Sequence, residues 1–188
     1  MTSGQRKSIP GRPRSDTTRQ AILDAALELV GEVGYPRTTV DGIAQRAGAG
    51  KQTIYRWWSG KAEVVLEALT SNAARAIPLP DLGDLRSDLY AFLRATFRAG
   101  RRAGIVPVLK ALMAEAQLDE AFAEAFRTRF LEHRREALAQ LLRQYPDQLR
   151  TSEAVALDVV FGALWYRGLV GHAPLNDALA RELTDLLT

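Results

Sequence analysis

Two short helical patterns follow one another almost without a gap between residues 39 and 58. The first covers residues 40–47, with Thr39 placed to cap its start and Gly48 placed to end it. The second covers residues 51–58. Two helices joined by so tight a turn form a helix-turn-helix, in which the second helix enters the major groove of DNA. The sequence therefore predicts a DNA-binding motif in this region.

The exposed face of the second helix carries side chains that suit DNA. Gln52 can form two hydrogen bonds with an adenine edge, and Thr53 can contact a thymine methyl group. Lys51, Tyr55 and Lys61 are better placed to contact the DNA phosphates. Thr38 and Thr39, at the start of the preceding helix, could donate further hydrogen bonds to the DNA backbone. The predicted DNA contacts are Thr38, Thr39, Lys51, Gln52, Thr53, Tyr55, Arg56 and Lys61. The alternative is that Lys51, Arg56 and Lys61 only form the solvated face of a helical domain.

Positive charge is concentrated toward the start of the chain. Residues 1–61 hold ten Lys or Arg against five Asp or Glu, whereas the whole chain has a net charge of only +3. Residues 1–15 are rich in Gly, Pro, Ser and basic residues and are expected to form a flexible arm. Arg12 and Arg14 give this arm a short basic element that suits a narrow minor groove. The alternative is a solvated tail that adds only general affinity for DNA.

Helical periodicity continues along the rest of the chain, and no segment shows the strict alternation of a half-buried strand. A first helix is expected from Thr17, capped by Asp16 or Thr17 and ended by Gly34. Further helices are expected over residues 61–77, 82–103, 105–117, 119–145, 152–173 and 175–187. The predicted fold is all-α, with a three-helix head that contains the helix-turn-helix, a C-terminal helical bundle and about nine helices.

Three segments together carry a family resemblance: AILDAALELVGEVGY (21–35), TTVDGIAQRAG (38–48) and KQTIYRWWSGKAEVVLEAL (51–69). They resemble the DNA-binding domain of the TetR/AcrR regulators. The resemblance implies that residues 16–76 bind double-stranded operator DNA and that residues 77–188 dimerise and bind a small molecule. It also implies that the positions of Lys51, Thr53, Tyr55 and Lys61 face the DNA.

The chain departs from the family pattern at three small residues. Ala49 replaces a larger aliphatic residue in the turn, and Gly50 and Gly60 stand where a capping serine is frequent. Glycine caps a helix start nearly as well as serine, so each change should cost only about a few tenths of a kcal/mol. Ser59 is the alternative cap for the helix that begins near residue 61.

Aromatic residues in the C-terminal bundle indicate an effector site. Phe122, Phe126 and Phe130 recur at four-residue spacing, and neighbouring helices add further aromatic and polar groups. The candidate wall consists of Phe92, Thr96, Met113, Phe126, Phe130, Trp165 and Tyr166. A cavity lined in this way would bind an apolar or amphipathic small molecule. The alternative is that these side chains simply pack the core.

The segment 152–173 is apolar on almost every side. Such a helix is either central in its own domain or shared with a second subunit. We expect it to form a homodimer interface with the final helix, through Leu157, Val160, Phe161, Leu164 and Gly168. The alternative is a buried position within one subunit.

Other classes of function find little support. The chain has no cysteine and only two histidines, so no metal, disulfide or cofactor is expected. The sequence shows neither a nucleophile with a nearby base nor a glycine-rich phosphate loop, so an enzyme is not expected. The first residues are polar and basic and do not resemble a secretory signal, so a cytoplasmic protein is expected. The most apolar stretch is interrupted by Asp158 and Arg167 and is shorter than the roughly 20 residues that span a bilayer, so no transmembrane helix is expected.

The expected function is that of a DNA-binding regulator, and specifically a repressor that a small molecule releases from its operator. Repression is the commoner mode in the family that the chain resembles. The alternatives are an activator of the same fold, a regulator without a small-molecule ligand, and an interaction protein that has lost DNA binding.

Overall fold

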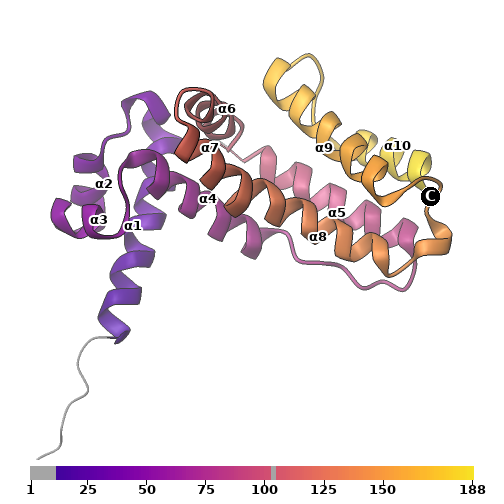
Figure 1. Ribbon diagram of the computed structural model, residues 1–188, viewed down its shortest axis with the longest axis horizontal. Coiled ribbons are helices and arrows are strands. Elements are labelled where there is room, and N and C mark those ends of the chain that lie inside the picture. The colour runs from indigo at the N-terminus through magenta and orange to yellow at the C-terminus, as the bar shows by residue number, and fades with distance from the viewer. Residues whose placement is uncertain (1–11, 103–104) are drawn as a thin grey trace, which may run out of the picture.

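The computed structural model describes residues 12–102 and 105–188, and over these ranges the chain is helical without a strand. The all-α prediction is confirmed. Figure 1 shows an elongated molecule with α1, α2 and α3 at one end and α9 and α10 at the other. None of the described helices is long and apolar enough to span a bilayer.

The head consists of α1 (Arg12–Val33), the 3-10 turn η1 (Tyr35–Arg37), α2 (Val40–Ala47) and α3 (Lys51–Trp57). The other helices are α4 (Lys61–Ala76), α5 (Leu85–Gly100), α6 (Ile105–Ala116), α7 (Glu120–Phe126), α8 (Glu132–Arg143), α9 (Glu153–Val170) and α10 (Asp177–Leu187). A π-helical turn η2 (Arg127–Leu131) joins α7 to α8, and a 3-10 turn η3 (Pro146–Gln148) follows α8. The predicted helix over 119–145 is therefore one helical run with a wider turn inside it.

Capping side chains explain most helix starts. Thr39 caps α2 by accepting a hydrogen bond from the backbone N–H of Gly42 at 3.0 Å, and Gly48 ends α2 with a φ of 62°, both as predicted. Asp84 caps α5 and Asn176 caps α10 in the same way. These two helices therefore begin a few residues later than predicted.

The predicted start of the first helix is wrong. α1 begins at Arg12 instead of near Thr17, so residues 12–15 are helical and do not belong to a flexible arm. Pro13 fits this position, because the first turn of a helix uses no backbone N–H donors within the helix. The rest of the predicted arm, residues 1–11, lies outside the described residues.

The start of α4 agrees with the first of the two caps that the sequence offered. Its N-cap is Gly60 and not Ser59. The backbone N–H of Ser59 instead donates to the carboxylate of Glu63 at 3.0 Å. A side chain in the first turn thus satisfies a backbone donor just outside the helix, which is half of a capping box.

The buried apolar side chains form two cores, and these do not coincide with the two predicted domains. The first core joins head residues such as Ile22 and Ile54 to Leu112 of α6 and Phe126 of α7. The second core is formed by α5, α8, α9 and α10, together with Ile77 and Leu175. α6 and α7 therefore pack on the head although they follow its last helix by more than 45 residues in sequence.

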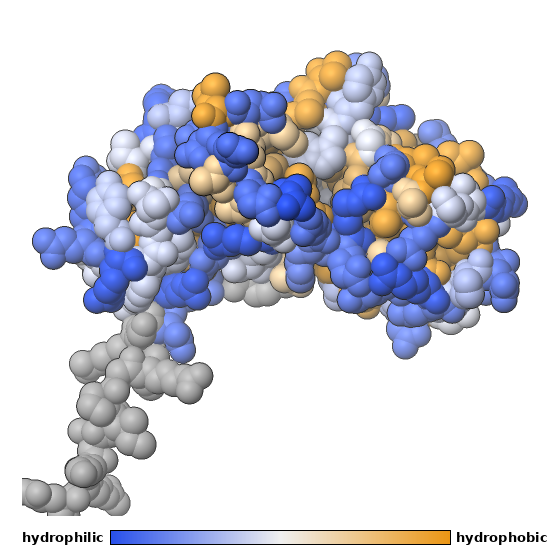
Figure 2. Space-filling view, in the orientation of Figure 1, coloured by the Kyte–Doolittle hydropathy of each residue, from blue (hydrophilic) through white to orange (hydrophobic). Residues whose placement is uncertain are grey.

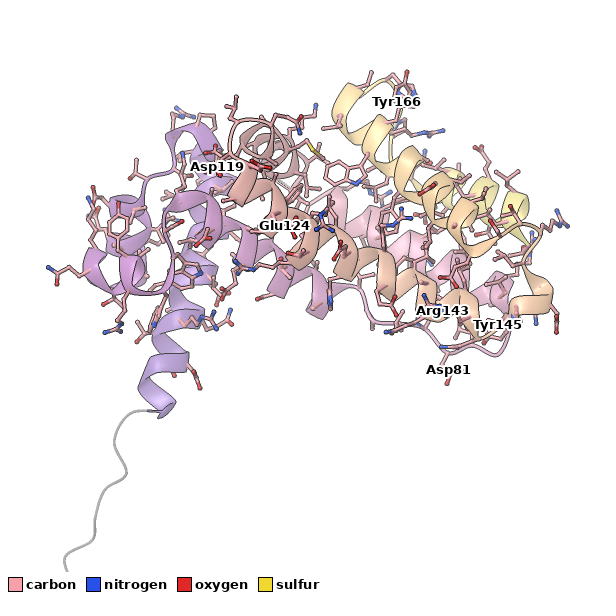
Figure 3. The ribbon with its side chains drawn as sticks, viewed as in Figure 1. Asp81, Asp119, Glu124, Arg143, Tyr145 and Tyr166 are labelled. Atoms are coloured by element: carbon pink, nitrogen blue, oxygen red, sulfur yellow. The ribbon has the colours of Figure 1, made fainter. Side chains whose placement is uncertain are left out.

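A buried carboxylate fastens the linker between α4 and α5. Asp88 is fully buried and accepts hydrogen bonds from the backbone N–H of Leu82 at 2.7 Å and from the Tyr145 hydroxyl at 2.8 Å. Replacing Asp88 by Ala leaves both donors without this acceptor, so we expect a loss of about 3 kcal/mol in the free energy of unfolding. Urea denaturation measures it. Asp81, on the same linker, points away from the body (Figure 3), and Asp81→Ala should change stability by less than about 0.5 kcal/mol.

Candidate DNA interface and effector cavity

The outer face of α3 presents the predicted DNA-binding side chains together. Lys51, Gln52, Tyr55 and Arg56 are exposed, with Tyr55 51% accessible, and they lie at helical spacing on one side of α3. Thr53 is half-buried beside them. The opposite side of α3 is fixed to the head by Ile54 and by the following Trp58, both buried, and the Trp58 ring meets that of Trp57 edge-on at 5.5 Å.

The two cations of α3, Lys51 and Arg56, differ in whether they form an ion pair within the protein. Lys51 Nζ lies 2.9 Å from a carboxylate oxygen of Asp41, and this hydrogen-bonded pair raises the pKa of Lys51 and ties α3 to α2. The Arg56 guanidinium stacks over the Trp57 ring at 5.0 Å and forms no ion pair with any described residue. Arg56 is therefore the cation on α3 that can meet DNA without giving up a partner.

Thr38 does not fit its predicted role. It is 1% exposed, its hydroxyl donates to the carbonyl of Gly34 at 3.0 Å, and its backbone N–H also bonds within the turn. Both donors are used internally because Thr38 closes η1 against the end of α1. Thr39, the next residue, is exposed and accepts only the capping hydrogen bond.

Lys61 is engaged inside the protein. Its ammonium donates to the carbonyl of Tyr35 at 3.1 Å and lies 4.3 Å from the centre of the Tyr35 ring. Burial, together with the nearby charge of Glu115, raises the pKa of Tyr35 to about 12. Lys61 thus fixes η1 to the start of α4. Arg12 and Arg14 belong to the first turn of α1, and their side chains lie outside the described part of the chain.

A cavity of about 420 Å³ lies between the two cores and is walled by α4, α5, α6, η2, α8 and α9. Three of the seven predicted wall residues line it: Thr96, Phe130 and Trp165. Its size is at the lower end of the range of small-molecule pockets, roughly 300–1,000 Å³. Most of the remaining wall is aliphatic.

The other four predicted wall residues do not line the cavity. Phe92 packs inside the second core and Phe126 inside the first, so both side chains are at most 1% exposed. Met113 packs against the first core from α6. Tyr166 is 61% exposed on the outer side of α9, beside the ring of His172 (Figure 3).

The sequence interpretation missed the polar part of the wall. Asn72, Lys110, Arg134, Arg135 and Asp158 also line the cavity. Arg134 is the unexpected one, because it is 7% exposed within the run EHRRE, which resembles a solvated face. Its position between Phe130 and Leu138, at four-residue spacing from each, was the available signal that it faces inward.

The predicted dimer residues lie on the inner side of α9. Leu157 and Val160 belong to the second core, whereas Phe161, Leu164 and Gly168 line the cavity. The opposite side of α9 carries Val155, Tyr166 and Val170, which are 49%, 61% and 58% exposed. Leu186 of α10 is 59% exposed as well.

The exposed apolar side chains on this outer side of α9 are called the apolar patch of the bundle. Figure 2 shows apolar residues gathered at the end of the molecule that holds α9 and α10. Exposed apolar side chains that gather in this way are typical of an interaction site. Within one subunit the residues predicted for the interface therefore face inward, and the outer side of α9 is the more exposed apolar side.

One carboxylate links the head to the bundle. Glu67 of α4 accepts hydrogen bonds from Arg19 of α1 at 2.8 Å, from the Trp58 indole N–H at 3.0 Å and from Arg129 of η2 at 3.3 Å. Its side chain is only 13% exposed. Phe130 and Leu131, next to Arg129 in η2, line the cavity. A short path of contacts thus runs from the cavity to the base of α3.

Comparison with known proteins gives consistent matches along the chain. Residues 22–68 match the family described as bacterial regulatory proteins, tetR family, and residues 79–187 match the tetracyclin repressor-like C-terminal domain. The chain is 39% identical over 183 residues to the uncharacterized HTH-type transcriptional regulator YdeS of Bacillus subtilis (strain 168), which covers 94% of this chain and 91% of that protein.

Two further proteins are similar over most of their length. The DNA-binding transcriptional repressor TetR of Mycobacteroides abscessus is 30% identical over 178 residues, covering 92% of each protein. Among solved structures, the TetR family transcription regulator SCO0332 superposes with a TM-score of 0.78 at 31% identity, covering 89% of this chain and 94% of that chain.

Proposed function

The chain belongs to the TetR family of helix-turn-helix, DNA-binding transcriptional regulators, and we propose that it is a repressor released from its operator by a small amphipathic or apolar effector. It is a regulator and not an enzyme. The observation that carries the proposal is the cavity of about 420 Å³, because α4 connects the helix-turn-helix to the bundle and forms part of the wall. A protein that regulates DNA in this way would act in the cytoplasm.

The proposed DNA-binding domain is residues 16–76, and the effector and dimerisation domain is residues 77–188. Within the first, we propose that Gln52, Thr53 and Arg56 read base edges from the outer face of α3. Tyr55, Lys51 and Thr39 would contact phosphates, and Arg12 and Arg14 would add minor-groove or backbone contacts from the start of α1. Lys61 would support these contacts through Tyr35.

Release of DNA requires that the effector favour one arrangement of the protein over another, since a ligand that binds both equally shifts nothing. In a two-fold dimer, the two α3 helices must lie about 34 Å apart to enter successive turns of the major groove. We propose that an effector in the cavity moves α4 and η2 relative to the second core and so changes this spacing.

DNA binding is tested by removing single contacts from α3. Lys51→Ala and Tyr55→Ala should each lower affinity about tenfold for operator and unrelated DNA alike, because phosphate contacts are independent of sequence. For Lys51→Ala the slope of log K against log [salt] should flatten by about one unit. Fluorescence anisotropy over a range of salt concentrations measures both.

Arg46→Ala is the matched control for this experiment. Arg46 is also a cation of the head, but it is paired with Glu32 and Glu28 of α1, away from α3. It should change neither the affinity nor the salt slope by much. If Lys51→Ala and Tyr55→Ala bind operator like the wild type, α3 does not dock as proposed.

Effector control is tested with the upstream intergenic DNA and a panel of small amphipathic compounds. Compounds that stabilise the protein against heat should also release it from this DNA. Stabilising compounds that never change DNA affinity would contradict effector control and favour a regulator without a small-molecule signal. Increased transcription of the neighbouring genes by the effector-free protein would indicate an activator.

A further inference from the structure

Arg134 is a buried cation without a counterion in the cavity wall. It is 7% exposed, forms no hydrogen bond or ion pair with any described residue, and its Nη2 is fully buried. Its guanidinium lies 5.4 Å from the centre of the Phe92 ring, which closes off one side. Burial lowers the pKa of Arg134. A protein rarely keeps an unpaired buried charge, because the desolvation cost is large unless a partner offsets it.

A second unsatisfied polar group lines the same cavity. The hydroxyl of Thr96, on α5, is buried and has no hydrogen-bond partner among the described residues. Buried donors and acceptors are almost always satisfied in folded proteins, so two unsatisfied groups in one cavity wall require an explanation. A bound ligand that accepts hydrogen bonds from both would supply it.

The other charges of the wall do not neutralise Arg134. Asp158 is the acidic group of the wall, and its Oδ1 lies 2.9 Å from Arg135. Its side chain is 72% exposed, so this pair is at the rim of the cavity. Lys110 adds another exposed cation. The wall therefore has an excess of positive charge, and its buried part holds only the guanidinium of Arg134.

We propose that the effector is an anionic amphiphile, a monocarboxylate with an alkyl chain of medium length, held by Arg134 and Thr96. The carboxylate would accept hydrogen bonds from the guanidinium and the hydroxyl, while its apolar part would pack on Ile105, Leu109, Phe130 and Trp165. The volume of about 420 Å³ suits a small carboxylate. The inference rests on the proposed function for the consequence of binding, namely release of DNA, but not for binding itself.

The test compares decanoate with 1-decanol and decylamine, which keep the alkyl chain and change the head group. Isothermal titration calorimetry should show that decanoate binds at least about tenfold more tightly than either. In Arg134→Met, which keeps about the length of the apolar stem and removes the guanidinium, decanoate affinity should fall about 10- to 100-fold, as for a lost hydrogen bond to a charged group. The affinity for 1-decanol should not fall.

Stability separates a ligand-binding role of Arg134 from a structural one. Because the unliganded wild type carries an uncompensated buried charge, Arg134→Met should raise the Tm of the unliganded protein by a few degrees. A purely structural role would lower the Tm instead. Thr96→Val, which keeps the shape of the side chain, should weaken decanoate severalfold without destabilising the protein.

Arg143→Met is the matched control, because Arg143 is an exposed arginine of the same helix that lies outside the cavity wall, paired with Glu136 and Glu153. It should change decanoate affinity less than about threefold. The proposal is overturned if decanoate binds no better than 1-decanol or decylamine, or if Arg134→Met and Thr96→Val bind decanoate like the wild type. Binding through Arg134 that leaves the operator complex intact would uphold the ligand class and refute effector control. Release of the operator by neutral compounds alone would uphold effector control and refute the proposed ligand class.

Discussion

The double variant Val155→Glu/Tyr166→Glu is expected to be a monomer and to bind operator at least about 100-fold more weakly than the wild type. Both side chains belong to the apolar patch of the bundle, at 49% and 61% exposure, and both lie on the outer side of α9. In a two-fold interface the same patch meets itself, so the variant would bring together four carboxylates without partners. A monomer has one recognition helix, and losing the second of two linked contacts typically costs about 10²- to 10⁴-fold.

Sedimentation velocity at micromolar concentration measures the mass, and anisotropy with a palindromic operator measures the affinity. Leu118→Glu is a suitable control, because Leu118 is 88% exposed between α6 and α7 and receives the same chemical change outside the patch. It should remain dimeric. Circular dichroism should show the same helix content in both variants, since the substituted side chains are exposed within one subunit. A wild-type protein that sediments as a monomer would refute the proposed interface.

The two faces of α9 show what periodicity alone can give. The sequence of α9 is apolar on almost every side, so it identified the helix as an interface candidate but contained no signal for the orientation. Orientation comes from contacts distant in the sequence: the second core takes Leu157 and Val160, and the cavity takes Leu164. Only Val155, Tyr166 and their neighbours remain for a partner.

The head was predicted more accurately because its signals are local. Thr39 and Gly48 fix the ends of α2 through hydrogen bonds and dihedral angles within a few residues, and the interpretation of both was correct. Lys61 and Thr38 were harder, because their partners, Tyr35 and Gly34, lie in a turn that sequence patterns do not resolve. A hydroxyl or ammonium that suits DNA by type can be used inside the fold.

Only three of the seven predicted wall residues line the cavity, for a related reason. Aromatic residues were chosen as wall candidates by type, but Phe92 and Phe126 are among the largest fully buried side chains and pack inside the cores instead. Arg134 was overlooked because arginine is rarely buried. Its position in the inner stripe of α8 and η2, between Phe130 and Leu138, carries more information than its residue type.

Replacing Glu67 by Gln is expected to reduce the effect of a bound effector on operator affinity at least about tenfold, while leaving operator binding by the free protein nearly unchanged. An effector usually changes the affinity of a second site by about 5- to 150-fold. A tenfold reduction of that change therefore removes most of the coupling between effector and operator. The reason is that the Glu67 carboxylate joins Arg129 of η2 to Arg19 and to the Trp58 indole in the head. Glutamine keeps the shape and one acceptor oxygen but removes the negative charge that attracts both arginines.

The neighbours of Glu67 explain why this link should carry the signal. η2 supplies Phe130 to the cavity wall, and α4 supplies Leu69 one turn or less from Glu67. A ligand that displaces either wall element must therefore move the carboxylate or break its bonds. The π-helical turn adds to this, because its wider hydrogen-bonding pattern is a common site of functional rearrangement in helices.

Glu63→Gln, one turn earlier on α4, is the matched control. Glu63 accepts a hydrogen bond from the backbone of Ser59 and takes no part in the link to η2, so its variant should respond to effector like the wild type. Measuring operator affinity with and without a saturating effector, for the wild type and both variants, isolates the coupling term. An unchanged response in Glu67→Gln would mean that the apolar contacts of the first core, which also bridge the head to α6 and α7, transmit the signal without the carboxylate.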